Sequence, residues 1–249
     1  MNSTAFSDTQ PHDPTAAAAS ALHLIGGEKG GVGKSVVARL LAQYFIDQSI
    51  PFAGFDTDRS HGALMRFYAD YASLIEVDSY TALDAIVEAA VETPGRRVLV
   101  DLAAQTHDAL VDWMDESGVL EVAADSGVAV HYWHVMDAGR DSVDLLQRLL
   151  DRFEGRLRYV LVLNQLRGDD FAQLEKSGQL ARAQTLGARI VRLKHLQDAV
   201  LRKIDAANAS FWAARTLPGN EGPKLGLLER QRLKMWLAHA NAEIAAAGV

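Results

Sequence analysis

One stretch near the N-terminus combines glycines, two lysines and a serine in a spacing suited to holding phosphate. Residues 26–35 read Gly-Gly-Glu-Lys-Gly-Gly-Val-Gly-Lys-Ser and follow a short apolar run. Glycines let the backbone wrap so that its N–H groups point inward, and the start of a following helix adds positive potential. In such a loop Lys34 reaches the β and γ oxygens of a nucleoside triphosphate, and the Ser35 hydroxyl ligates Mg²⁺. The stretch therefore predicts a triphosphate site with Mg²⁺.

Carboxylates stand where two other apolar runs end. Asp56 and Asp58 follow the run 52–55, and Asp101 follows the run 97–100. The carboxyl ends of parallel strands deliver residues to the ligand crevice of such sheets. Because Mg²⁺ keeps several waters, a carboxylate placed there holds the ion through water. We predict Asp101 as a metal residue. Asp56 and Asp58 are expected at the same edge of the sheet, with loop-capping residues as the alternative for both.

The elements that must position these residues follow from the hydrophobic pattern. Short runs rich in Val, Leu and Ile predict strands at Leu22–Ile25, Phe52–Phe55, Val98–Val100, Val128–Val135, Tyr159–Leu163 and Ile190–Leu193. Helical patterns lie between and after them, at Lys34–Gln48, Thr81–Val91, His107–Glu116, Ser142–Phe153, Phe171–Leu186, His195–Ala207 and Leu227–Ala246.

Continuously apolar strands separated by helices are typical of a parallel sheet covered on both faces. The expected fold class is therefore α/β, a doubly wound and mostly parallel sheet with helices on both faces. We expect a flexible leader at residues 1–20 and a single domain at residues 21–249, including the C-terminal helix at about 227–246.

Residues 29–35, Lys-Gly-Gly-Val-Gly-Lys-Ser, resemble the deviant Walker A loop of the ParA/MinD family of P-loop ATPases. The plain Walker A pattern fails because Glu28 stands where its first glycine belongs. The resemblance covers about residues 21–214 and implies ATP bound by Gly30, Gly31, Val32, Gly33, Lys34 and Ser35. It also implies that Lys29 reaches across an ATP-bound homodimer to the partner's phosphates, as an arginine finger does.

The resemblance extends to other positions. It implies that Asp56 lies near the magnesium shell, that Asp58 orients the attacking water, and that Asn164, at the end of a strand, contacts the adenine. A turn-forming residue is the alternative for Asn164. The chain departs from the family pattern after Asp58, where Arg59-Ser60 replaces the usual Pro-Gln. It departs again after Asp101, where residues 102–106 contain no proline.

The function that this resemblance implies is an Mg-ATP-dependent dimerising switch that positions or partitions a cargo such as plasmid DNA, a transfer complex or a protein assembly. Hydrolysis of ATP to ADP and phosphate is expected to be slow and stimulated by an activating or cargo protein. Two alternatives stay open: an ATP-dependent ligase or kinase on the same scaffold, and a non-hydrolysing nucleotide-gated adaptor.

Composition narrows the chemistry and suggests a further partner. The 249 residues include no cysteine, which excludes disulfides, thiolate zinc sites and iron–sulfur clusters and favours a cytoplasmic location. Residues 1–150 hold 9 Lys and Arg against 22 Asp and Glu, whereas residues 151–249 hold 16 against 10. The basic C-terminal part is suited to non-specific DNA binding. The stripe of Leu233, Leu237, Ala240 and Ile244 in the last helix is expected to pack against the domain or a subunit partner rather than against a membrane.

Two histidines near residue 130 invite a metal-site interpretation that the strand pattern argues against. Alternation along the predicted strand puts His131 and Trp133 on one face and His134 on the other. Because histidines on opposite faces cannot share a metal ion, packing or contact with a partner is the expected role.

Overall fold

The computed structural model describes residues 19–27, 29–59, 62–104 and 106–248. The strands in these ranges form one sheet in the order β3-β2-β4-β1-β5-β6-β7, and every neighbouring pair is parallel. They are β1 (Ala21–Gly26), β2 (Phe52–Asp56), β3 (Ala72–Leu74), β4 (Arg97–Asp101), β5 (Ala129–Met136), β6 (Arg158–Asn164) and β7 (Arg189–Leu193).

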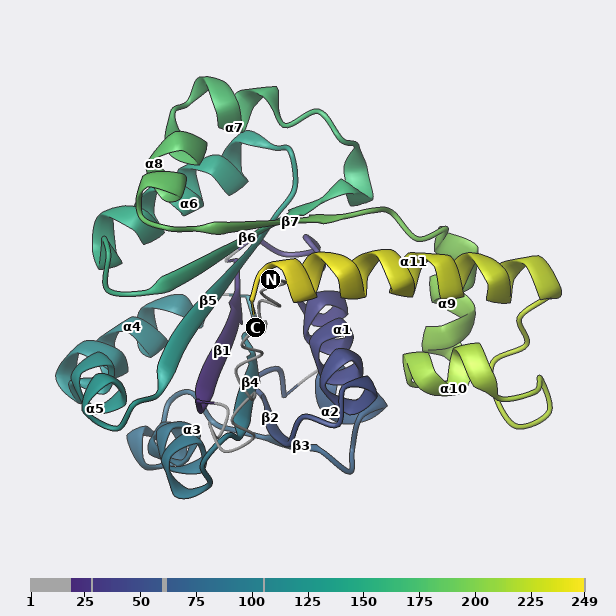
Figure 1. The fold of residues 1–249 in the computed structure, drawn as a ribbon, viewed down its shortest axis with the longest axis horizontal. Coiled ribbons are helices and arrows are strands. Elements are labelled where there is room, and N and C mark those ends of the chain that lie inside the picture. The colour runs from purple at the N-terminus through teal and green to yellow at the C-terminus, as the bar shows by residue number, and fades with distance from the viewer. Residues whose placement is uncertain (1–18, 28, 60–61, 105, 249) are drawn as a thin grey trace, which may run out of the picture.

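The helices of the described ranges lie on both sides of this sheet (Figure 1). They are α1 (Lys34–Asp47), α2 (Ala63–Phe67), α3 (Tyr80–Glu92), α4 (His107–Glu116), α5 (Val119–Asp125), α6 (Arg140–Phe153), α7 (Ala172–Lys176), α8 (Gln179–Thr185), α9 (Asp198–Ala206), α10 (Phe211–Thr216) and α11 (Leu227–Ala246), with a single 3₁₀ turn at Gln165–Arg167.

Two apolar cores fill the spaces between the sheet and its helices. One core joins the sheet to α3, α4, α5, α6, α7 and α8, and Trp113 is its largest fully buried side chain. The other joins the opposite face to α1, α2, α9, α10 and α11. Residues alternate between the two cores along β5, since Tyr132 lies in the first and Trp133 in the second. The doubly wound α/β fold predicted from the sequence is confirmed.

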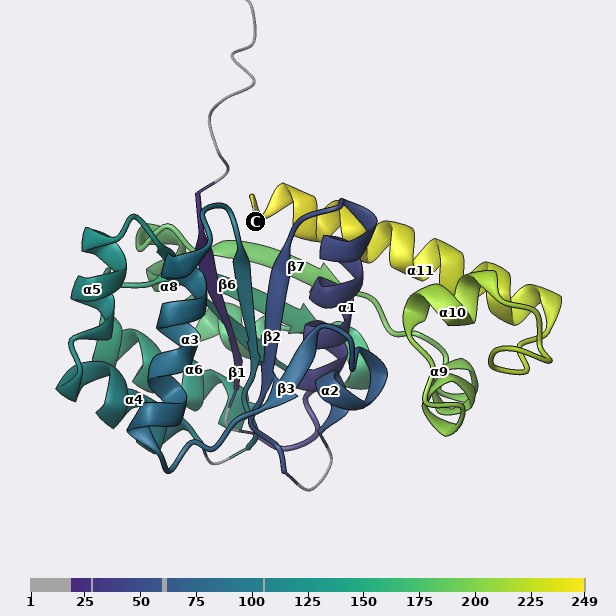
Figure 2. The ribbon, with the colours of Figure 1, turned by 90° about the horizontal axis from the view of Figure 1, so that it is seen from below.

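Helix α11 spans 20 residues and extends past the sheet to the lobe that contains α9 and α10 (Figure 2). The predicted stripe of Leu233, Leu237, Ala240 and Ile244 is buried, which confirms its packing against the protein. Trp236 lies on the same side, and its indole Nε1 donates a hydrogen bond to the Lys194 carbonyl at 2.6 Å. Every helix in the described part of the chain is too short or too polar to span a lipid bilayer.

Several predicted boundaries were wrong. The helix expected at Phe171–Leu186 is two helices, because Gly178 adopts a left-handed conformation (φ 77°) and the Ser177 hydroxyl accepts a hydrogen bond from the Gln179 N–H. The helix expected from His195 begins at Asp198, since Gln197 is extended. The pattern also missed β3, α2, α5 and α10, each eight residues or shorter. Most of the predicted leader, residues 1–18, lies outside the described residues.

The histidines of β5 pack as the strand pattern predicted. His131 stacks on His23 of β1 with ring centroids 4.9 Å apart, and the Trp133 indole donates to His23 Nδ1 at 3.1 Å. His134 lies on the other face, where its Nε2 is 3.3 Å from the Ser142 carbonyl oxygen. Their role in the core is therefore packing.

Candidate functional site

The glycine-rich loop connects β1, in the middle of the sheet between β4 and β5, to the start of α1. Gly27 (φ 131°) and Gly33 (φ 97°) adopt left-handed conformations that other residues rarely reach. A Cβ at Gly27 would lie 2.5 Å from the Val135 carbonyl oxygen, and one at Gly33 would lie 2.4 Å from Asn164 Nδ2. The loop thus needs glycine for conformation and for close approach to its neighbours.

Asn164, at the end of β6, holds this loop in place. Its side chain is buried, and Nδ2 donates a hydrogen bond to the Val32 carbonyl at 2.7 Å. Val32 itself points into the core beneath the loop and is 1% exposed. The contact between Asn164 and adenine remains a prediction, and the described geometry gives this residue a loop-holding role as well.

Most of the predicted phosphate and metal residues surround one cavity of about 250 Å³, but Asp56 and Val32 do not line it. It is lined by Gly30, Gly31, Gly33, Lys34, Ser35, Val36, Asp58 and Asp101, with Leu102, Ala103 and Ala104 at one side. These residues come from the loop, the start of α1 and the carboxyl ends of β2 and β4, and the fold brings them together as the sequence predicted.

Lys34 is the buried first residue of α1, and its ammonium points back toward the loop. Its Nζ donates a hydrogen bond to the Lys29 carbonyl at 3.1 Å. Burial lowers the pKa of Lys34, while the charges of Asp101 and Asp58 oppose that effect. The side chain is therefore close to two carboxylates and holds a bond that an incoming phosphate oxygen would replace.

Asp101 is the residue whose surroundings fit a cation. It is 3% exposed, and its Oδ1 has no hydrogen-bond partner. Burial and the neighbouring charge of Asp56 raise its pKa to about 7, although a hydrogen bond with Ser35 acts in the opposite direction. An unpartnered buried carboxylate oxygen is costly, and a metal-bound water would satisfy it.

In the described residues no group of three or more His, Asp or Glu side chains could hold a metal ion by itself. Mg²⁺ at nucleotide sites is commonly bound through one or two protein groups together with substrate phosphates. Ser35 and Asp101 fit that arrangement.

Asp56 differs from Asp101 because hydrogen bonds already engage both its oxygens. Oδ1 accepts from the Asp58 N–H at 3.0 Å, and Oδ2 accepts from the N–H groups of Leu64 and Met65 at 2.8 and 3.2 Å. The carboxylate thus holds the segment after β2 and the start of α2. This geometry favours the loop-capping alternative for Asp56, and its role near a metal stays a prediction.

Thr57, which the sequence interpretation passed over, ties the segment after β2 to the segment after β4. Its hydroxyl donates to the Asp101 carbonyl at 3.1 Å and accepts from the Ala103 N–H at 2.7 Å. Its position between two strand-end aspartates was the available signal. These two hydrogen bonds therefore join the two cavity walls that carry Asp58 and Asp101.

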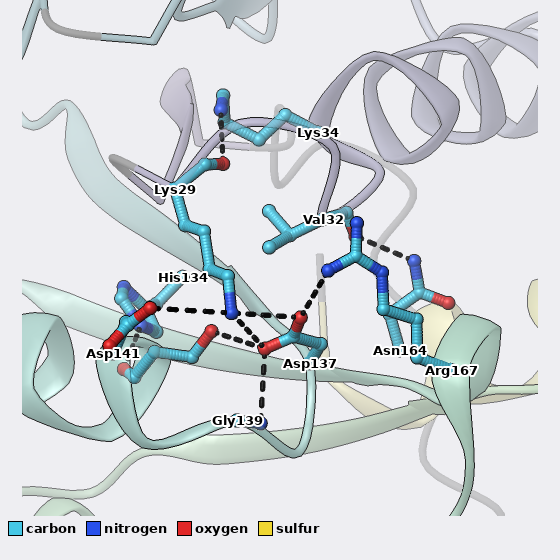
Figure 3. A network of polar contacts seen from close by, with 10 residues as sticks. Lys29, Val32, Lys34, His134, Asp137, Gly139, Asp141, Asn164 and Arg167 are labelled. Carbon is cyan, nitrogen blue, oxygen red and sulfur yellow. Dashed lines mark hydrogen bonds and ion pairs between the residues drawn. The ribbon is translucent and has the colours of Figure 1, made fainter.

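The Lys29 side chain points away from the cavity toward a carboxylate at the end of β5 (Figure 3). Its Nζ lies 3.2 Å from both oxygens of Asp137 and 3.8 Å from Asp141. Asp137 also accepts hydrogen bonds from the Ser142 hydroxyl at 2.7 Å and the Gly139 N–H at 3.1 Å. Burial would raise the pKa of Asp137, but these bonds and the Lys29 charge hold it below its usual value.

Arg167 is a second cation on Asp137, with Nη1 at 3.3 Å from Oδ2. It follows β6 and passes close to the loop, where a Cβ at Gly31 would lie 3.3 Å from its Nη2. Neither Asp137 nor Arg167 was predicted. Asp137 carried the same signal as Asp101, a carboxylate directly after an apolar strand.

A parallel α/β sheet with a glycine loop between its central strand and a helix, and with Lys34 and Asp101 at its carboxyl edge, defines a P-loop nucleotide-binding protein. Residues 24–206 match the CobQ/CobB/MinD/ParA nucleotide binding domain. The chain therefore belongs to that family.

Solved structures similar to the chain come from several organisms. A MinD cell division protein from Aquifex aeolicus is 14% identical, with a TM-score of 0.49 and coverage of 88% of this chain and 97% of that one. A Borrelia burgdorferi B31 protein assigned to plasmid partition and bound to AMPPNP is 14% identical, with a TM-score of 0.47 and coverage of 89% and 98%.

A nucleotide-binding protein from Archaeoglobus fulgidus in complex with ADP is 17% identical, with a TM-score of 0.44 and coverage of 74% and 85%. No protein of curated function matches the chain.

Proposed function

We propose that the protein is an Mg-ATP-dependent switch in which two copies clasp two nucleotides and slow hydrolysis releases them. The observation that carries the proposal is the separation of the two loop lysines. Lys34 lines the cavity with Ser35, Asp58 and Asp101, whereas the ammonium of Lys29 lies outside it on Asp137. Because the Lys29 ammonium belongs to the loop but lies outside the cavity of its own subunit, it is suited to contact a phosphate bound by a second subunit.

Each cavity residue has a role in this proposal. Lys34 leaves the Lys29 carbonyl and binds β and γ oxygens, and the loop N–H groups bind the same phosphates. Ser35 and Asp101 would hold Mg²⁺, which supplies charge neutralisation on those oxygens when it is bound. Asp58 orients the attacking water, and the Lys29 of each copy stabilises the charge that develops on the partner's transferring phosphoryl group.

The experiment is size-exclusion chromatography with light scattering on wild type, Lys29→Ala and Asp58→Ala, each with and without Mg-ATP. Asp58→Ala is expected to accumulate as an ATP-bound dimer because hydrolysis is blocked, while Lys29→Ala stays monomeric. A dimer that ignores nucleotide in all three proteins would refute the switch. ATP binding without phosphate release by wild type, with any added partner, would favour the adaptor alternative.

Positioning of a DNA cargo is the second part of the proposal, and one surface favours it. A hollow of about 510 Å³ between α10 and α11 is lined by Arg215, Arg230 and Lys234 together with Thr216 and Asn241, and no carboxylate lines it. Arg215 is already paired with Asp47 through two hydrogen bonds. Arg230 and Lys234 are therefore the cations available to phosphodiesters.

The DNA proposal predicts retention on a non-specific duplex that falls steeply between low and moderate salt. Lys234→Gln should reduce that retention and its salt slope, whereas Lys176→Gln on α7 is a matched control with an exposed lysine elsewhere. Absence of retention at low salt, with and without ATP, would remove DNA from the partners.

A further inference from the structure

The solvent-facing side of α11 carries a row of six uncharged residues, five of which are apolar. Leu228, Gln231, Met235, Ala238, Ala242 and Ala245 are all exposed, on the side opposite the buried stripe. Leu228 and Met235 are 66% and 65% exposed, so this side of the helix presents two large apolar side chains to solvent. The six positions are separated by steps of three and four residues, which is the heptad spacing of a helix that packs against another helix.

The row is complementary to itself in one orientation. Its large side chains lie in the first half of α11 and its alanines in the second half. When a second copy runs antiparallel, Leu228 faces the partner's Ala245, Gln231 faces the partner's Ala242, and Met235 faces the partner's Ala238. Each layer then joins a long side chain to a short one, as close packing requires. A parallel pair would place leucine on leucine and alanine on alanine.

The flanking charges are compatible with the antiparallel arrangement. Lys234 lies beside the partner's Asn241, and Arg232, which donates to Gln197 at 3.1 Å, lies beside the partner's His239. The row itself contains no charged residue. The pairing therefore places no charge within the row itself, and Lys234 and Arg232 lie at its edges.

We infer that α11 is a self-association face to which a second copy of this chain docks antiparallel. The helix is about 30 Å long, and a strip about 10 Å wide would bury roughly 300 Å² on each copy. The two copies together would bury roughly 600 Å², about half of the roughly 1,200 Å² total that a stable interface needs. Isolated subunits therefore associate only weakly. Subunits already joined in pairs associate more strongly through multivalency, and this last step rests on the proposed ATP-dependent dimer.

Two separate two-fold interfaces have a consequence for assembly. One pairing through the nucleotide and another through α11 would generate an open chain of subunits rather than a closed dimer. The α11 pairing itself needs no nucleotide.

Disulfide trapping tests the inference, since the chain has no cysteine of its own. Leu228→Cys and Ala245→Cys proteins, distinguished by a mass tag, are mixed without nucleotide under mild oxidation. The mixed pair is expected to cross-link at least tenfold faster than Leu228→Cys alone. Ala181→Cys, an exposed alanine on α8, is the matched control for random collision.

Two results would overturn the inference. Equally fast cross-linking of Leu228→Cys with itself would mean a parallel pair. Cross-linking of the mixed pair no faster than that of Ala181→Cys would mean that another molecule covers this face. Sedimentation of Met235→Glu gives a second readout, because the exposed charge should abolish concentration-dependent association without unfolding the helix.

The same experiment separates this inference from the proposed function. Cross-linking should persist in the Lys29→Ala background, where the ATP-dependent dimer is lost. An intact ATP-dependent dimer with no α11 cross-link would refute the self-association face alone.

Discussion

Replacing Asp137 by Asn should make the proposed ATP-dependent dimer form more readily. The ion pair with Asp137 holds Lys29 on its own subunit, and Lys29 must leave it to reach a partner. Asparagine keeps an oxygen that accepts from Ser142 and Gly139, as Asp137 Oδ1 does now. The substitution therefore removes the charge that holds Lys29 and Arg167, and it leaves the hydrogen bonds from Ser142 and Gly139.

The size of the effect follows from the burial of the pair. The side chain of Lys29 is 23% exposed and that of Asp137 is 5% exposed. The pair lies between a surface ion pair, worth about 0.2 to 1 kcal/mol, and a buried one, where loss of a partner costs about 3 to 5 kcal/mol. We take about 1.4 kcal/mol per subunit, a factor of about ten. A dimer releases two lysines, so its association constant should rise about a hundredfold.

The assay is a light-scattering titration of wild type and Asp137→Asn at saturating AMPPNP and Mg²⁺. Asp144→Asn is the matched control, because it removes an exposed carboxylate of α6 whose partner is Arg140 at 3.7 Å. The control should dimerise like wild type. Unchanged or weaker dimerisation of Asp137→Asn, with AMPPNP binding intact, would refute the view that the ion pair restrains Lys29.

Three further outcomes are expected. Asp101→Asn should lower ATP affinity at least tenfold with Mg²⁺ and change it little in EDTA, as measured by calorimetry, because the negative charge that attracts the ion is lost. Thr57→Val should reduce the unfolding free energy in urea by about 1 to 2 kcal/mol, since it leaves the Ala103 N–H unsatisfied. Burial lowers the pKa of His131 to about 4 and also lowers that of His23. Their folded forms therefore bind fewer protons than the unfolded chain, and their contribution to stability, present above pH 6.5, is lost as the pH falls toward 4. The stability of wild type relative to His131→Phe should fall by about 3 kcal/mol over that interval, and a constant difference would contradict the assignment.

The parts of the fold that local pattern determines could be predicted from the sequence. Buried parallel strands are continuously apolar, so β1, β4 and β6 were evident, and the carboxylates that end β2 and β4 were placed at one edge. Strand β3 was missed because it has three residues, Ala72-Ser73-Leu74, and pairs only with β2 at the sheet edge. So short an edge strand needs no apolar run.

The contacts that shape the site depend on strand order, which the sequence pattern did not supply. Lys29 and Asp137 are 108 residues apart and meet because β5 lies beside β1. Asp56 was expected near the metal, yet its carboxylate accepts hydrogen bonds from the Asp58 N–H and, because α2 begins next to it, from the N–H groups of Leu64 and Met65. Residue type and position predicted which groups could react. They did not predict which groups the fold would already have engaged.

The hydrogen bond from Lys34 to the Lys29 carbonyl gives the loop an order of events. A phosphate that attracts the Lys34 ammonium must first break this bond, and the bond ends on the residue whose side chain Asp137 retains. Binding of a phosphate would therefore affect Lys29, the residue proposed to contact the partner's nucleotide. In the proposed switch, Lys29 stays on Asp137 and Lys34 on the Lys29 carbonyl until a phosphate binds, so the nucleotide-dependent dimer would form only after ATP has bound.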